Sequence, residues 1–346
     1  MRRNIIALVV VLMVACGDSG PNGPTPPPGP PPPPPPPPDP GPGPFFSVSP
    51  IEPGLLARIT PIGYNNKVLP VAHTYWETCE MWGTTPLGLP CSRAKLPLKA
   101  PGSGKVHHVD PSTDGQITVE GPPGFSWHFG HVTPRAGLVV GDTIHAGDVI
   151  ATMVYDHGFD FGAVHHGISH SWIVPEHWSE AALHAQHPVA QFPPGIRNQL
   201  LTRMHPISPP YGRVSYDVDG TASGAWVVQG SNPVYFTRDN EPLWIWFGRW
   251  ADTPTTRLAT FGDPLPGGAW RFAADPSAPD WESITPASGI VAIKLWSLGS
   301  NGKPNPEWGF GTLLLQLTAP RRLKAEWFDT HDPVSAFTAA AKEYER

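Results

Sequence analysis

The chain has 346 residues, a formal net charge of −6 and only 15% charged residues. This acidic balance argues against a nucleic-acid partner, which calls for a basic face. The 48 prolines, 36 glycines and 14 tryptophans indicate an extracytoplasmic, β-rich protein. Most of its tryptophans should lie in a core, and stacking of exposed ones on sugars is the alternative.

The first 16 residues have the pattern of an export signal. Arg2 and Arg3 give a positive start, and residues 5–14 form an apolar run. That run is too short for a membrane-spanning helix, which needs about 20 residues. It ends in LMVAC, which resembles a lipobox, so we predict that Cys16 is lipidated and anchors the chain to a membrane. An ordinary secretory signal with an unrelated cysteine is the alternative.

Residues 17–44 are nearly all proline and glycine. Such a segment cannot bury a core and predicts an extended polyproline II tether, with a proline-recognition ligand as the alternative. If lipid takes Cys16, Cys79 and Cys91 remain as an even pair in a compartment where disulfides persist. We therefore predict a Cys79–Cys91 disulfide; two reduced, buried cysteines are the alternative.

The remaining 300 or so residues exceed what one small domain needs, so we predict two domains, 45–205 and 206–346. Short runs rich in β-branched and aromatic residues, bounded by turn formers, predict strands. These runs are residues 116–119, 137–140, 148–154, 212–218, 243–247, 290–296 and 311–317. Helices are expected only at 179–186 and at 333–346. The expected fold is therefore mostly β, and its second domain is a barrel or sandwich with a short C-terminal helix.

Four segments of the first domain resemble, in order, motifs of the lysostaphin-type, LytM-like zinc endopeptidases. Residues 99–106 (KAPGSGKV) resemble their A-P-x-x-G-x-V turn, and residues 129–132 (FGHV) resemble Y-A-H-L. Residues 139–151 (VVGDTIHAGDVIA) reproduce the family's glycine spacing, and residues 163–168 (AVHHGI) overlay H-x-H-F-x-I. The resemblance implies a compact, mostly antiparallel β domain of the duplicated-hybrid-motif type.

The resemblance also implies a metal site. In the family, zinc is held by the H-x-x-x-D pair and the second histidine of H-x-H, which leaves a position for water whose pKa falls to about 7. Carried over to this chain, the zinc ligands are His73, Glu77 (in place of the usual aspartate) and His165. His131 matches the catalytic histidine of Y-A-H. Ala163 stands where the other catalytic histidine is expected.

The second domain resembles, at residues 212–221, 311–317 and 337–346, uncharacterised β domains that follow LytM-like modules in some exported bacterial proteins. Three functions stay open. The replacement at Ala163 favours a degenerate module that binds peptidoglycan or regulates a cell-wall hydrolase. The histidines favour an active zinc endopeptidase that cleaves peptidoglycan peptides. The third is a carbohydrate-binding lipoprotein. Each function places the protein in the cell envelope, lipid-anchored and outside the cytoplasm.

Overall fold

The computed structural model describes most of the chain after the proline-rich segment. The described ranges are residues 43–64, 68–79, 93–112, 114–207, 209–233, 237, 239–265, 269–299 and 302–346. The predicted signal, the lipidation site Cys16, most of the tether and Cys91 lie outside them. By its contacts the chain divides into units 1–34 and 35–346, and all described residues belong to the second. Within the described ranges, no helix has the length and apolar character needed to cross a membrane.

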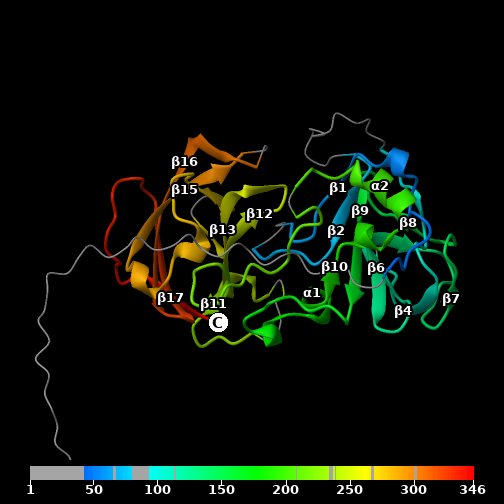
Figure 1. Cartoon of the computed structure of the whole chain (residues 1–346), viewed down its shortest axis with the longest axis horizontal. Coiled ribbons are helices and arrows are strands. Elements are labelled where there is room, and N and C mark those ends of the chain that lie inside the picture. Colours follow the sequence, from blue (N-terminus) through cyan, green and yellow to red (C-terminus); the bar gives the residue numbers. More distant parts are fainter. Residues whose placement is uncertain are drawn as a thin grey trace, which may run out of the picture. The chain divides into compact units, whose positions relative to one another are not determined.

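The fold is mostly β, as predicted, and its first assembly is an antiparallel sheet. Its strand order is β1-β2-β9-β6-β5-β4-β7, with β10 paired to β9, and β8 paired to both β6 and β3. Figure 1 shows β9 (Gly158–His165) between β2 (Thr74–Glu77) and β6 (Phe125–Pro134). The other strands are β1 (Arg58–Ile59), β3 (Pro97–Lys99), β4 (Gly104–Asp110), β5 (Gly115–Glu120), β7 (Thr143–Ile144), β8 (Val149–Met153) and β10 (Ala185–Gln186).

Alternation of side chains explains why this sheet has a packed face. On β9, Phe159, Phe161 and Ala163 are buried in a core that also holds Trp127 and Phe129 of β6. The intervening residues of β9 point to the opposite face, because successive side chains on a strand alternate. The sequence therefore places a continuous apolar surface behind the residues that form the candidate site.

The strand predicted at residues 137–140 is wrong. Gly137 and Gly141 both have positive φ, and Val139 and Val140 are 57% and 62% exposed. Two glycines in this conformation fold the segment into turns, so its apolar residues have no sheet to join.

The helices of the described residues are short. They are η1 (Pro53–Leu55), η2 (Pro175–His177), α1 (Glu180–Leu183), η3 (Pro188–Gln191), α2 (Pro194–Leu201), η4 (Glu241–Leu243), η5 (Trp281–Ser283) and η6 (Pro286–Ser288). The side chain of Ser179 caps α1 by accepting a hydrogen bond from the Ala182 N–H. The helix is shorter than predicted, because Ala185 and Gln186 leave it to pair with β9.

The second assembly is a closed, antiparallel barrel whose strands follow chain order, β11 to β18. They are β11 (Gly224–Val228), β12 (Trp244–Trp250), β13 (Thr253–Leu265), β14 (Ala269–Ala274), β15 (Val291–Leu298), β16 (Pro304–Ala319), β17 (Arg322–Phe328) and β18 (Lys342–Glu345). A barrel of this strand number has an interior that side chains can fill. Here Phe247, Phe272 and Leu313 belong to one buried cluster, and buried Trp281 of η5 joins them and donates to the Gly248 carbonyl over 3.0 Å.

The helix predicted at residues 333–346 is wrong, because its end forms β18 between β17 and β11. The run of alanines at 339–341 favours a helix locally. The barrel, however, leaves the edges of β11 and β17 unpaired unless another strand joins them. Tyr344 is opposite Leu323 and Val228 and is buried, so this last strand closes both the hydrogen bonding and the core.

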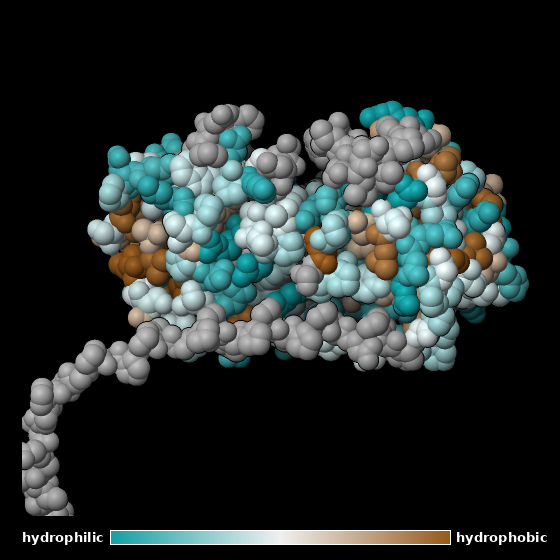
Figure 2. All heavy atoms as spheres, turned by 45° about the horizontal axis from the view of Figure 1, so that its top comes forward, coloured by the Kyte–Doolittle hydropathy of each residue, from teal (hydrophilic) through white to brown (hydrophobic). Residues whose placement is uncertain are grey.

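Most of the described tryptophans lie in these cores. Of those whose side chains the structure describes, none is exposed, and several are fully buried: Trp76, Trp127, Trp226, Trp244, Trp246 and Trp281. On the face shown in Figure 2, hydrophobic surface is interspersed with hydrophilic surface. Among the tryptophans whose side chains are described, Trp296 and Trp327 are half-buried and the others are buried.

Candidate functional site

Two histidines and two aspartates meet on the face of the sheet opposite the aromatic core. We call His73, His131, Asp160 and Asp114 the Asp160 cluster. The Nε2 of His73 lies 3.2 Å from Asp160 Oδ2, and the Nε2 of His131 lies 3.3 Å from the same oxygen. The Nδ1 of His131 contacts Asp114 Oδ1 in a short hydrogen bond. One carboxylate is therefore flanked by two imidazoles, and a second carboxylate orients one of them.

A β-bulge brings His131 into this cluster. On β6, Gly130 is opposite Gln116 and Val132 is opposite Gly115, so His131 is the extra residue between them. Its φ is +60°, in the left-handed region that residues other than glycine rarely adopt. Regular alternation after buried Phe129 would have turned His131 into the core. The bulge instead lets Val132 enter the core and directs His131 toward Asp160.

Asp160 remains a carboxylate in this setting. Burial alone would raise its pKa, but the charges of His73, His131 and His128 and the hydrogen bond from His73 together lower it. Asp160 Oδ1 is buried without a hydrogen-bond partner among the described residues. Its other oxygen, Oδ2, is the one that both imidazoles contact.

His128 occupies space that a neighbouring residue leaves free. It lies on β6 opposite Gly162 of β9, and its ring covers that glycine. A Cβ built on Gly162 would lie 2.0 Å from His128 Cε1, far inside a normal contact. Burial, together with the charge of nearby His73, lowers the pKa of His128 to about 4, and Asp160 only partly opposes this. The ring is thus neutral at physiological pH.

The predicted zinc ligands do not converge. His73 lies in the Asp160 cluster, but the ring of His165 lies 5.6 Å from Phe45 and 6.2 Å from Phe125. His165 is five residues from Asp160 on β9, so the two side chains point to opposite faces of the sheet. Glu77 ends β2, and its carboxylate lies 3.9 Å from Arg58.

The strand positions explain this separation. Ala163 and His165 were matched to H-x-H from the sequence motif alone, but Ala163 is buried against Trp127 in the core. The two alternate positions of β9 that face His73 and His131 are Asp160 and Gly162. Where the resemblance implies two histidines on this face, the chain has an aspartate and a glycine. The residues present therefore do not fit the zinc site that the resemblance implies.

Sequence reasoning missed Asp160, Asp114 and Gly162. It had placed His131 by its motif, but no motif marks Asp160, because a lone aspartate between two phenylalanines has no distinctive spacing. The alternation of buried residues around Phe159 and Phe161 was the only available signal. Cys79 is buried and disulfide-bonded; its predicted partner Cys91 lies outside the described residues, so that pairing stays a prediction.

A second group of side chains lies apart from this cluster. His166, Glu180 and His184 are the only three histidine, cysteine or acidic residues among those described whose ligand atoms all lie within 4.8 Å of one another. Sequence reasoning did not bring these three residues together. The available signal was the four-residue spacing from Glu180 to His184.

No protein-family model matches the chain, and no curated protein is similar to it. Among solved structures, Csd3 of Helicobacter pylori is similar over 36% of this chain and 31% of its own, with 13% identity and a TM-score of 0.27. The catalytic domain of the antimicrobial peptidase lysostaphin from Staphylococcus simulans is similar over 37% of this chain and 85% of its own, at 16% identity and a TM-score of 0.25. For LytU the shares are 44% and 92%, the identity 19% and the TM-score 0.27. The matched region is under a third of the Csd3 chain. With TM-scores this low, these similarities support no conclusion beyond the geometry described above.

Proposed function

We propose that the first β domain is a divergent LytM-like module that binds cell-wall peptide without cleaving it. In this proposal the lipid on Cys16 holds the chain to a membrane, and residues 17–44 extend the domain toward the wall. The observation that most supports this proposal is that Asp160 and Gly162 occupy the face of β9 beside His73 and His131. An enzyme of the resembled family needs histidines on that face.

The chemistry of the cluster supports binding over zinc-dependent hydrolysis. Ligands on one tetrahedral zinc lie about 3.4 Å apart, at bond lengths near 2.1 Å. Glu77 and His165 are directed elsewhere, toward Arg58 and two phenylalanine rings. The glycine at 162 has no donor atom, and the neutral ring of His128 covers it.

The same atoms suit a peptide. The Asp160 side chain is 13% exposed, and its carboxylate can accept a hydrogen bond from an amide or an ammonium group. His73 and His131 flank it with ring nitrogens. Cell-wall peptides carry amide and amino groups that can donate to this carboxylate. Hydrogen bonds to a charged group contribute about 1.5–3 kcal/mol, enough to position a ligand but not to transform it.

Sedimentation with purified peptidoglycan tests this proposal. We expect the chain to sediment with it, and Asp160→Asn to weaken binding about tenfold, as the loss of one charged hydrogen bond predicts. The matched control is Glu120→Gln, because Glu120 forms an exposed pair with His107, 3.2 Å apart, outside the cluster. Equal binding by Asp160→Asn and the unaltered chain would contradict the assignment.

The second candidate is an active zinc endopeptidase. The contact between His73 Nε2 and the Asp160 carboxylate, at 3.2 Å, favours it, because an imidazole and a carboxylate can both ligate zinc. It requires peptide-bond cleavage that depends on zinc and on His73. The carbohydrate-binding alternative has no specific observation in its favour: among the tryptophans whose side chains are described, only Trp296 and Trp327 are half-buried, and the others are buried.

A further inference from the structure

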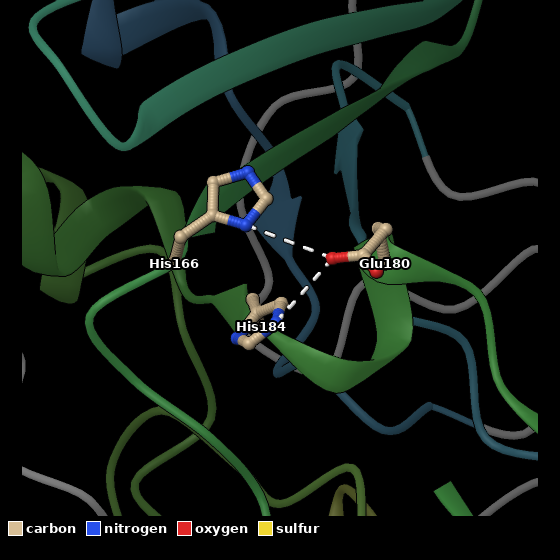
Figure 3. Close-up of side chains that lie close together, drawn as sticks. All are labelled: His166, Glu180 and His184. Carbon is tan, nitrogen blue, oxygen red and sulfur yellow. Dashed lines mark ion pairs between the residues drawn. The ribbon is translucent and has the colours of Figure 1, made fainter. Parts of the chain in front are cut away.

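His166, Glu180 and His184 form a compact group of two imidazoles and a carboxylate, which we call the His166 group. The Nδ1 of His166 lies 3.6 Å from Glu180 Oε2, and the Nε2 of His184 lies 3.4 Å from the same oxygen. Figure 3 shows both rings facing that oxygen. These separations match the spacing of about 3.4 Å between ligands on one tetrahedral zinc ion.

The fold fixes the positions of all three residues. Glu180 and His184 are four residues apart around the single turn of α1, so they share a face. His166 directly follows β9, and its N–H donates to the Gly124 carbonyl over 2.8 Å. The N–H of His165 donates to the His184 carbonyl over 3.0 Å, which ties the end of β9 to the end of α1. The group therefore sits on two anchored segments.

A hydrogen bond behind His184 selects the form of its ring that binds metal. The Nδ1 of His184 contacts the Ile168 carbonyl, which is an acceptor only, so Nδ1 must carry a proton. The Nε2 of the same ring faces the Glu180 carboxylate at 3.4 Å. Its lone pair and the carboxylate are then directed at one point, where a metal ion would contact both. A ring nitrogen that donates to a backbone carbonyl is the usual support of a metal-bound histidine.

The geometry points to a divalent-metal site at the His166 group, with zinc as its occupant. Two imidazoles and one carboxylate are a donor set that zinc takes, and a water molecule completes the tetrahedron. The His184 side chain is 19% exposed, while those of His166 and Glu180 are 52% and 71% exposed, so an ion can enter from solvent. The bound ion would link the end of β9, through His166, to α1, through Glu180 and His184. This site uses none of the residues of the Asp160 cluster.

Zinc binding to the full chain tests the assignment, with a chromophoric chelator as competitor and cobalt(II) absorption as a second readout. We expect one equivalent of zinc. Glu180→Gln and His166→Ala should each weaken its binding at least tenfold, on the order of what a lost ligand or its support costs. Both residues are exposed, so these variants keep the fold; circular dichroism checks this. The matched control is His107→Ala, because His107 also pairs with a glutamate but has no third ligand.

The outcomes separate this site from the other cluster. Loss of zinc in Glu180→Gln and His166→Ala, with retention in His107→Ala and His73→Ala, supports the assignment. Retention of tight zinc in Glu180→Gln and His166→Ala overturns it. Loss in His73→Ala alone also overturns it, because the metal then sits in the Asp160 cluster. Absence of any zinc binding by the unaltered chain overturns it outright.

Discussion

Replacing Gly162 by alanine tests how His128 packs on β9 beside the Asp160 cluster. The new Cβ would lie 2.0 Å from Cε1, 2.5 Å from Nε2 and 2.9 Å from Nδ1 of His128. Apolar contacts normally begin near 3.5–4 Å, so the ring must move by about 1.5 Å or more. Such overpacking costs about 1–3 kcal/mol of unfolding free energy. Because the displaced ring gains solvent, we also expect the pKa of His128 to rise from about 4 toward 6.5.

Two measurements follow the substitution. Histidine resonances followed against pH report the pKa of His128, and urea unfolding reports stability. The control is Gly195→Ala in α2, where an added Cβ meets nothing within 4 Å and φ is ordinary. That change should be neutral or stabilising, by up to about 1 kcal/mol. An unchanged His128 pKa and an unchanged unfolding free energy in Gly162→Ala would refute the packing described for this face.

Two further predictions concern stability. Burial lowers the pKa of His128 to about 4 and of His187 to about 3, so both rings are neutral in the fold while the unfolded chain takes up protons below pH 6.5. The free energy of unfolding should therefore be independent of these two rings above pH 6.5 and should fall on acidification. Each ring lowers it by up to about 1.4 kcal/mol per pH unit. The decrease due to His128 continues down to about pH 4, and that due to His187 down to about pH 3. Unfolding at pH 7.5 and pH 5 measures this, and equal free energies would contradict it. In the second prediction, Asp217→Ala removes the carboxylate 3.7 Å from Arg346, where both side chains are under 5% exposed. An uncompensated buried charge costs about 3–5 kcal/mol; a loss below about 1 kcal/mol in urea unfolding would show that the pair is not buried as described.

The sequence predicts the β-rich character well, because strands show it locally, as short runs of alternating apolar residues. The runs at 243–247, 290–296 and 311–317 lie largely or wholly within barrel strands, as their aromatic and β-branched residues indicate. The strand predicted at 212–218 is wrong, because only Gly212 pairs there, in an isolated bridge to Ile62. The C-terminal helix failed because closure of the barrel outweighs the local preference of three alanines. That outcome depends on edges of β11 and β17 that are distant in sequence.

The candidate site was only partly predictable for the same reason. His73 and His131 were found because they stand in recognisable motifs. The bulge that turns His131 out of the core has no signature in FGHV, since a single extra residue depends on the pairing of β6 with β5. The phase of β9 was also misread, because its residues are buried on both faces and hide the alternation. A shift of an odd number of residues then moves every side chain to the other face.

Cleavage of purified peptidoglycan by the zinc-loaded chain tests the central claim most directly. Soluble products are analysed by mass spectrometry and new amino termini are counted, with His73→Ala alongside. The account predicts that the chain sediments with the wall and releases no peptide above the level of His73→Ala. Release of peptides with new termini by the unaltered chain, lost in His73→Ala and on chelation, would contradict it and establish the endopeptidase instead.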